Sequence, residues 1–210
     1  MKILVATKNR GKFNEISGFL NGLKDVDVEF LGDLDVRDDD FVEDGETHEE
    51  NAMKKARYYW NKVCGRSVYD FVLGEDSGIY VDALADELGV HTRRWGAGHD
   101  ASDKEWLEYF MKEMALRAIE DERRGAKFVC HACLKGADHE SFYSGETLGK
   151  ITRDISCAVL PGLPLSSVFR PEGFDQVYAE LGRDKKNEIS HRGQAISKVK
   201  EFLTKLKWNS

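Results

Sequence analysis

Basic and polar side chains gather directly behind the first apolar run of the chain. Residues 3–6 are apolar, and the polar loop that follows consists of Thr7, Lys8, Asn9, Arg10, Gly11 and Lys12. Helically spaced apolar residues come next, so backbone N–H groups, cations and neutral polar side chains would meet at a helix start, as a polyphosphate requires. The loop lacks the glycines and the Lys-Ser/Thr pair of a Walker A motif. A solvated basic turn is the alternative.

Two adjacent carboxylates, Glu75 and Asp76, follow an apolar run at residues 71–73 and precede Ser77 and Gly78. Carboxylates at a strand end can hold Mg²⁺ and orient a water molecule. Because neighbouring side chains of a strand point to opposite faces, both reach one ion only if the strand ends before Glu75. An acidic turn without a ligand is the alternative.

Glu43 and Lys55 carry charge at positions that have no motif of their own. Glu43 lies in the acidic stretch 33–46, which is too polar for a core and is expected to be solvated. Asn51 and Lys55 are four residues apart and are predicted to share the polar face of one helix. The apolar face of that helix is predicted to consist of Met53, Ala56, Trp60 and Val63. A solvated lysine is therefore the simplest interpretation of Lys55.

A third polar block, which contains Lys186, Ser190, His191 and Arg192, lies just before the last apolar periodic segment. Ser190 can cap a terminal helix, and His191 and Arg192 would then occupy its first turn. Cations there oppose the helix dipole, which favours an anionic or hydrogen-bond-accepting partner. The arginine fork can read two acceptors on a base edge. A capped amphipathic helix with solvated charges is the alternative.

The elements that must position these residues alternate between strands and helices. Apolar runs or alternation predict strands at residues 3–6, 26–30, 71–73 and 128–134. Helical spacing predicts helices after residue 12, after the Thr47 and Glu50 capping box, after the Ser102 and Glu105 capping box, and from about Ser190 to the end. The fold class is therefore α/β or mixed α+β. No internal repeat or linker is evident.

Composition excludes several classes of protein. The 210 residues are 41% hydrophobic, enough for one domain over residues 1–210, or two lobes that share a core. No apolar run is long enough to span a membrane, and the first one is too short for a signal peptide. The net charge of −7 argues against binding to a nucleic-acid backbone. Four cysteines are too few for a disulfide scaffold, which favours the cytoplasm.

Cysteine and histidine offer no separate metal motif. Cys130 and Cys133 have CxxC spacing, but no second pair exists and the two side chains would point to opposite faces of a strand. We therefore assign them to the core. Histidines without ligand spacing are left unassigned; they are His48, His91, His99, His131 and His139.

Together these blocks resemble the inosine triphosphate pyrophosphatase family, which removes deaminated purine nucleoside triphosphates. The resemblance spans nearly the whole chain and follows the family order. It is carried by residues 7–12, 44–52 with 55–57, 75–78 and 186–192, with further similarity at 169–174 and 178–180. The family fold implied is elongated and two-lobed, around a long mixed sheet with flanking helices and a central nucleotide cleft. A homodimer is the usual assembly.

The resemblance also implies a role for each matching residue. Thr7, Asn9 and Lys12 would hold the triphosphate, with Lys55 adding positive charge. Glu43, Glu75 and Asp76 would bind Mg²⁺, while Asp76 would also activate the attacking water and Ser77 would contact the nucleotide. Lys186, His191 and Arg192 would read the purine through an acceptor oxygen at position 6. The implied reaction is water attack on the α-phosphate of ITP, dITP or XTP, which gives the monophosphate and pyrophosphate.

One segment departs from the family pattern. Where the family has a Phe-Gly-aromatic-Asp-Pro stretch, this chain has residues 161–168, with Leu163 in place of a stacking aromatic and Ser166 in place of an aspartate. Loss of base stacking costs about 1–3 kcal/mol by analogy with single-strand binding. Two alternatives follow: the same chemistry on a different modified nucleotide, or a nucleotide-binding module without catalysis. Retention of Lys12, Glu75 and Asp76 argues against the second.

Overall fold

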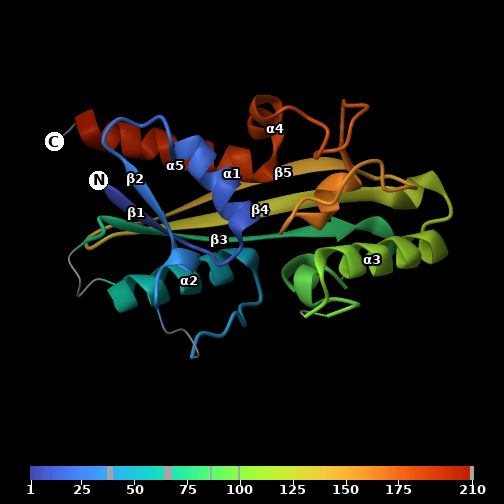
Figure 1. The fold of residues 1–210 in the computed structure, drawn as a ribbon, viewed down its shortest axis with the longest axis horizontal. Coiled ribbons are helices and arrows are strands. Elements are labelled where there is room, and N and C mark those ends of the chain that lie inside the picture. The colour runs from blue at the N-terminus through green and yellow to red at the C-terminus, as the bar shows by residue number, and fades with distance from the viewer. Residues whose placement is uncertain (37–39, 64–67, 86, 99, 209–210) are drawn as a thin grey trace.

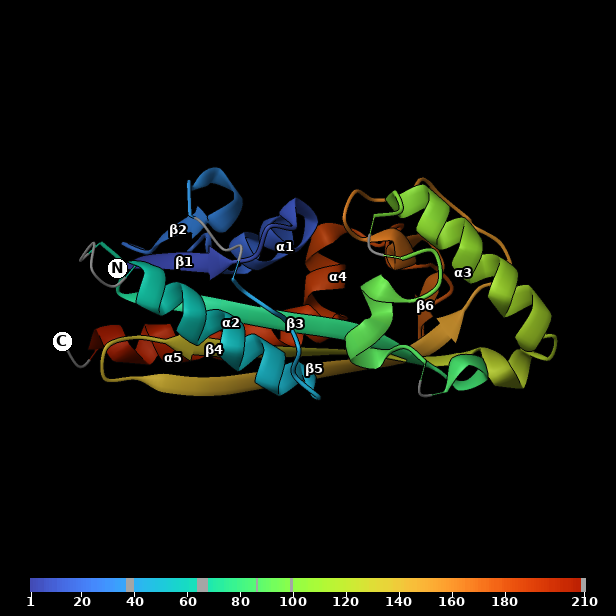
Figure 2. The ribbon, with the colours of Figure 1, turned by 90° about the horizontal axis from the view of Figure 1, so that it is seen from below.

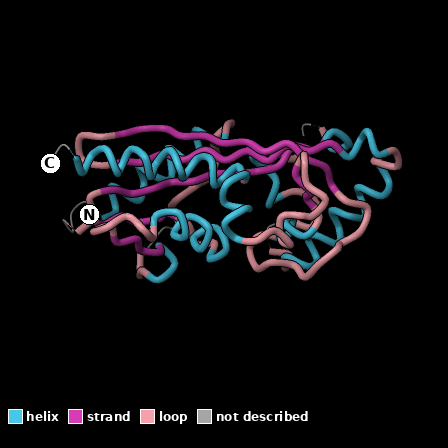
Figure 3. The backbone as a smooth tube through the Cα atoms, turned by 90° about the horizontal axis from the view of Figure 1, so that it is seen from above, coloured by secondary structure: helices cyan, strands magenta, loops and turns pink. Residues whose placement is uncertain are grey.

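Among the described residues, six strands form one mixed sheet that runs the length of an elongated molecule (Figure 1, Figure 3). The computed structural model describes residues 1–36, 40–63, 68–85, 87–98 and 100–208. In the spatial order β2-β1-β3-β4-β5-β6, β1 pairs in parallel with β2 and β3, and the other pairs are antiparallel. The strands are β1 (Lys2–Ala6), β2 (Asp27–Phe30), β3 (Phe71–Val81), β4 (Gly125–Lys135), β5 (Glu140–Ile151) and β6 (Phe169–Pro171). The predicted fold class is confirmed.

In the part of the chain that the structure describes, five α-helices flank this sheet. Figure 1 shows α1 and α5 along one side of the sheet and α2 along the other, and Figure 2 shows α3 at the end opposite the start of β1. The α-helices are α1 (Arg10–Leu20), α2 (His48–Val63), α3 (Asp103–Arg117), α4 (Arg183–Ile189) and α5 (His191–Trp208). Short 3₁₀ turns are η1 (Leu31–Asp33), η3 (Asp82–Leu84), η4 (Gly89–Arg94), η5 (Asp121–Arg124) and η6 (Pro164–Ser167). No helix among the described residues has the length and apolarity to span a bilayer.

The central strand β3 divides the core into separate apolar clusters. Leu73 belongs to a cluster with α1 and α5, whereas its neighbour Val72 packs with α2 through Tyr59. Further along the strand, Ile79 joins a third cluster that includes Phe110 of α3. Because alternate side chains of a strand face opposite ways, β3 is buried on both faces.

The expected end of a strand before Glu75 is wrong. β3 continues to Val81, and both Glu75 and Asp76 lie in regular antiparallel register with β4, opposite Ala132 and His131. The apolar sequence signal stops at residue 73, but eleven residues pair because β4 supplies a partner throughout. Adjacent carboxylates are therefore directed to opposite faces of the sheet.

The predicted faces of α2 also need correction. The helix begins at His48 after Thr47, whose hydroxyl accepts the Glu50 N–H at 3.1 Å, while the Glu50 carboxylate accepts from the Glu46 N–H at 2.8 Å. Asn51, expected on the polar face, has no exposed surface. Asn51 is nevertheless buried because its side chain has a polar partner there: its Oδ1 accepts the Gly45 N–H at 2.7 Å. The buried residues of α2 are His48, Asn51, Ala52, Ala56, Tyr59 and Val63.

The predicted start of the first helix, after residue 12, is wrong, because Asn9 caps a helix that already begins at Arg10. The helix predictions at Ser102 and Ser190 hold. Ser102 and Glu105 form a complete capping box at the start of α3, which buries Trp106, Phe110 and Met114 as expected. Ser190 Oγ accepts the Gly193 N–H at 3.0 Å and so caps α5.

The core assignment of the two cysteines also holds. Cys130 lies near Glu75, whereas Cys133 packs against α2 through Ala52, so they face opposite sides of β4. Cys64 and His99, from the same analysis, lie outside the described residues.

Close contact between α2 and β3 depends on Gly74, which yields a stability prediction. A Cβ at this position would lie 2.3 Å from the Ala52 carbonyl oxygen and 2.7 Å from the Ala56 nitrogen. We expect Gly74→Ala to lower the free energy of unfolding by about 1–3 kcal/mol, because the helix must move away from the strand. Urea denaturation measures this. Gly22→Ala is the control: a Cβ there meets nothing within 4 Å, and an equal loss in both variants would contradict the packing argument.

Candidate active site

A cleft of about 660 Å³ lies between the end of the molecule that carries α1 and α2 and the end that carries α3. Its walls come from segments far apart in the sequence, including Lys12 of α1, Trp106 of α3 and Arg192 of α5. The predicted site residues that line it are Thr7, Lys8, Asn9, Lys12, Glu43, Lys55, Asp76, Ser77, Lys186, His191 and Arg192. All three sequence blocks therefore converge on one cavity.

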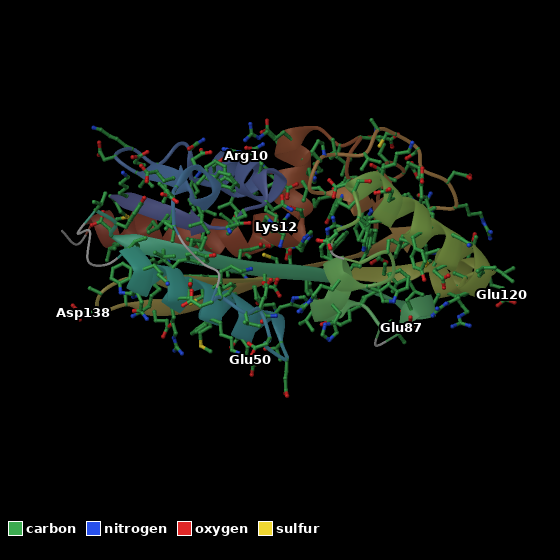
Figure 4. The ribbon with its side chains drawn as sticks, turned by 60° about the horizontal axis from the view of Figure 1, so that its bottom comes forward. Arg10, Lys12, Glu50, Glu87, Glu120 and Asp138 are labelled. Atoms are coloured by element: carbon green, nitrogen blue, oxygen red, sulfur yellow. The ribbon has the colours of Figure 1, made fainter. Side chains whose placement is uncertain are left out.

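Four predicted residues do not line the cleft. Arg10 is exposed, pairs with Asp33 at 2.5 Å and lies farther from the centre than Lys12 (Figure 4). Gly11 supports the loop instead: a Cβ there would lie 2.5 Å from the Pro161 carbonyl oxygen. Ser190 caps α5, and Glu75 is buried beneath the cleft floor.

The shape of loop 7–12 is set by Asn9. Its Oδ1 accepts the Lys12 N–H at 3.0 Å and caps α1, while its own N–H donates to Thr7 Oγ1 at 3.1 Å. Its Nδ2 donates to the Gly162 carbonyl oxygen at 2.9 Å. Asn9 thus joins the basic loop to the segment across the cleft. The local sequence explains the start of the helix, since asparagine is a favoured N-cap.

Glu75 is the centre of a buried ionic group. Its Oε2 lies 3.0 Å from Lys12 Nζ, and its Oε1 accepts from Arg192 Nε at 3.1 Å. Burial raises the pKa of Glu75, but the charges of Lys12, Arg192 and Lys55 lower it well below its ordinary value. For Lys12, burial alone would lower the pKa, but the charge of the Glu75 carboxylate outweighs burial and the pKa of Lys12 is raised. Glu75, Lys12 and Arg192 are therefore all charged at neutral pH.

Glu15 is a site residue that the sequence analysis missed. Its carboxylate pairs with Lys186 at 2.6 Å and also with Arg192, so it joins α1 to the two helices of the third block. Burial raises the pKa of Glu15, but Arg192 and Lys186 outweigh burial and lower it. Its position three residues after Lys12, on the same helical face, is the signal that could have identified it.

Asp76 faces α2, on the side of β3 opposite Glu75. Its Oδ2 lies 2.6 Å from His48 Nδ1 and 3.5 Å from Asn51 Nδ2. Burial raises the pKa of Asp76, but the His48 hydrogen bond and the charges of Lys12 and Lys55 lower it overall. Because an ionised carboxylate only accepts, His48 Nδ1 is the donor. His48, Asn51 and Lys55 share one helical face by spacing, a signal that was available in the sequence.

Lys55 bridges two parts of the cleft wall. Its Nζ lies 2.5 Å from Glu43 Oε1 and donates to the Glu75 carbonyl oxygen at 3.0 Å. The positive charge of Lys55 is therefore stabilised between the acidic stretch 33–46 and β3. Among the described residues, no group of three or more His, Cys, Asp or Glu side chains could hold a metal ion. Of the three predicted metal ligands, the structure brings Glu43 and Asp76 to the cleft and directs Glu75 to the other face of the sheet.

The other end of the cleft is lined by flat rings. The His191 ring stacks on Phe128 at 4.6 Å with an interplanar angle of 7°, and Tyr178 lies beside both. Burial lowers the pKa of His191 well below its ordinary value, so the ring is neutral at neutral pH, and its buried Nδ1 has no hydrogen-bond partner among the residues that the structure describes. Leu163 and Ser166 line this end too, and Ser166 Oγ lies 3.4 Å from Lys186 Nζ.

A cationic end and an aromatic end within one cleft are what an α/β protein needs to bind a nucleotide. Comparison with known proteins gives the class more closely. The model of the Ham1 family matches residues 3–202. A dITP/XTP pyrophosphatase of Bdellovibrio bacteriovorus is 37% identical over 207 residues, 98% of each chain, and one of Oceanobacillus iheyensis is 34% identical over 203 residues, 96% of this chain and 98% of that one.

Solved structures agree with the family match. A HAM1 protein from Coxiella burnetii superposes with a TM-score of 0.77 at 29% identity, covering 98% of this chain and 99% of that one. The Staphylococcus aureus Ham1 protein gives a TM-score of 0.72 at 28% identity over 97% and 98% of the two chains. The chain belongs to the Ham1 family. The predicted family and the predicted enzyme class, a nucleoside triphosphate pyrophosphatase, are confirmed.

The Glu15 ion pairs predict a pH-dependent contribution to stability. We expect Glu15→Gln to lower the free energy of unfolding by about 3–5 kcal/mol at pH 7, because Lys186 and Arg192 lose a buried partner. The folded pKa of Glu15 lies below its ordinary value of 4.5, so the contribution is complete above that value and disappears as the pH falls through the folded pKa. Urea denaturation between pH 7 and pH 2 should show the difference between variant and wild type narrowing with acid.

The control for this prediction is Glu188→Gln. Glu188 is exposed and pairs with Lys185 on the surface, so its loss should cost less than about 1 kcal/mol at every pH. A Glu15→Gln penalty that stays constant down to pH 2 would mean that the carboxylate charge is not what stabilises the fold.

Proposed function

We propose that this protein hydrolyses ITP, dITP and XTP to the monophosphate and pyrophosphate, and so removes non-standard purines from the nucleotide pool. The observation that carries the proposal is the convergence of loop 7–12, Asp76 and the Lys186 to Arg192 segment on a single cleft. The curated relatives are named dITP/XTP pyrophosphatases, which supports dITP and XTP as substrates. Phosphoryl transfer requires mainly positioning and charge neutralisation, which these residues are suited to supply.

In this proposal, the triphosphate lies against the start of α1. Lys12 and Lys55 neutralise phosphate charge, helped by Lys8, while the backbone N–H groups of Arg10 and Gly11 and the Thr7 hydroxyl donate hydrogen bonds. Asn9 acts chiefly by shaping this loop, because its side chain is already committed to Lys12 N–H and Gly162. Ser77, which lines the cleft next to Asp76, contacts the nucleotide.

Asp76 accepts a proton from the attacking water. The water oxygen forms a bond to the α-phosphorus, and the bond from that phosphorus to the α,β-bridging oxygen breaks, so pyrophosphate leaves with the bonding pair. The hydrogen bond from His48 holds Asp76 Oδ2, which leaves Oδ1 for the water. The lowered pKa keeps Asp76 ionised, and thus able to accept, at neutral pH.

Glu43 and Asp76 fit the requirements of Mg²⁺. This ion is commonly held by one or two carboxylates together with substrate phosphates, and both side chains line the cleft. The position of Lys55 Nζ against Glu43 supports a preference for positive charge at this wall. When bound, Mg²⁺ would neutralise the negative charge that develops on the phosphate oxygens.

The base is placed between the aromatic end of the cleft and Lys186. Arg192 donates to Glu75, Glu15 and Ser77, so its guanidinium is already engaged. We therefore assign direct reading of the purine oxygen chiefly to Lys186 and to neutral His191, with Arg192 holding them in place.

A second candidate keeps the chemistry and changes the base. Leu163 and Ser166 lie in the cleft wall at the aromatic end, where their small or aliphatic side chains leave the base edge with fewer specific contacts. The substrate would then be a different modified nucleoside triphosphate.

A cytoplasmic location and a homodimeric assembly remain predictions. The cysteine count supports the first, and the family resemblance supports the second.

Asp76→Asn tests the assignment of the base. We expect pyrophosphate release from ITP with Mg²⁺ to fall by about 10²–10⁴-fold, because the amide cannot take the proton of the water, while the circular dichroism spectrum is unchanged. Asp138→Asn is the control, since Asp138 is exposed at one end of the molecule (Figure 4). An unchanged rate in Asp76→Asn would exclude this residue as the base.

A substrate panel distinguishes the candidate functions. We expect the wild-type protein to release pyrophosphate from ITP, dITP and XTP at least about tenfold faster than from ATP, because Lys186 and His191 favour an acceptor oxygen at position 6 over the amino group of adenine. Preference for another modified base would favour the second candidate. Binding without release from any substrate would instead identify a nucleotide-binding module.

A further inference from the structure

Glu75 is one of the most deeply buried charged residues among those that the structure describes. Its side chain has no exposed surface, although it lies in the middle of β3 directly under the cleft. The groups around it come from three other elements: Lys12 from α1, Arg192 from α5 and Cys130 from β4. A carboxylate so placed has a role that its sequence motif, a pair with Asp76, does not reveal.

The surroundings of Glu75 do not suit a metal ligand. Its Oε1 accepts from Arg192 and lies 3.5 Å from Cys130 Sγ, and its Oε2 forms an ion pair with Lys12. Neither oxygen borders the cleft, whereas Asp76 does and faces α2 on the other side of the strand. Two cations already compensate the charge of Glu75, so a third would have to displace one of them.

The same contacts join the two ends of the cleft. Lys12 lies in the first turn of α1, which is proposed to hold the triphosphate, and Arg192 belongs to the segment proposed for the base. Each lies about 3 Å from the one carboxylate, which also separates two cations that would otherwise repel each other. The Glu75 carboxylate, which lies beneath the cleft, therefore sets the distance between Lys12 and Arg192 before any ligand binds.

We infer that Glu75 is a positioning residue that fixes Lys12 and Arg192 relative to each other beneath the cleft, and is not a ligand of the metal ion. The inference rests on the proposed function for what the two cations hold. It differs from the metal role that the Glu75–Asp76 motif implies, and of the three predicted metal ligands it leaves Glu43 and Asp76 available to Mg²⁺.

Metal-free and metal-loaded nucleotide binding separate the two roles. The dissociation constant of a non-hydrolysable α,β-imido analogue of ITP is measured by calorimetry in EDTA and again in saturating Mg²⁺. For Glu75→Gln we expect weaker binding by about tenfold or more in both buffers, with an unchanged ratio between them, because the lost partner acts on Lys12 and Arg192. For Asp76→Asn we expect the enhancement by Mg²⁺ to disappear.

Two outcomes would overturn the inference. One is a loss of affinity in Glu75→Gln that occurs only in Mg²⁺, which would make Glu75 a metal ligand. The other is unchanged affinity in both buffers. Glu146→Gln is the matched control, since that carboxylate is exposed on β5 and should leave both constants unchanged. If the wild-type protein neither binds the analogue nor hydrolyses ITP, the proposed function fails and Glu75 is judged from stability alone.

A stability measurement also tests the inference if Glu75→Gln folds poorly. Glu75→Gln leaves two cations facing a neutral amide, so the double variant Glu75→Gln with Lys12→Met restores the balance of charge. We expect the urea midpoint of the double variant to exceed that of Glu75→Gln alone, which demonstrates coupling between the two residues. Additive losses would show that Glu75 does not hold Lys12, and would overturn the inference independently of any nucleotide.

Discussion

A carboxylate removed from water stays charged only where cations compensate it, and this constraint at Glu75 organises the centre of the molecule. Lys12 and Arg192 supply the compensation from two helices on the same side of the sheet. Glu15 extends the group to Lys186. A chain of alternating charges therefore links α1 to the last two helices, and the cationic floor of the cleft exists before a ligand adds its own negative charge.

The alternation of β3 turns two neighbouring acids into groups with separate environments. Asp76 points toward α2, where His48 and Asn51 hold one of its oxygens, whereas Glu75 points away from it. Close approach of α2 makes this possible, since Gly74 lets the helix backbone approach the strand. The position of Asp76 against α2 therefore depends on Gly74 as well as on the side chains that contact its carboxylate.

Sequence patterns located most of the site but not its internal contacts. The polar loop after residue 6 and the block at residues 186–192 were identified because their composition interrupts apolar periodicity, and both line the cleft. Burial of Asn51 and the length of β3 could not be read locally, because each depends on a partner distant in sequence: Asp76 for the first and β4 for the second. The helical spacing of Glu15 from Lys12 was visible in the sequence, but its ion pairs with Lys186 and Arg192 were not, because those partners are distant in sequence.

Gly162 provides a second connection between the two ends of the cleft, above the one at Glu75. Its N–H donates to Asp103 Oδ2 at 2.6 Å, and its carbonyl accepts from Asn9 at 2.9 Å. The backbone here has φ of +75°, and a Cβ would lie 2.4 Å from Asn9 Oδ1, so glycine is required on both counts. Leu163 follows directly. We therefore expect substitutions in this segment to act through Asn9 on the loop proposed to bind phosphate, which would couple base preference to phosphate geometry.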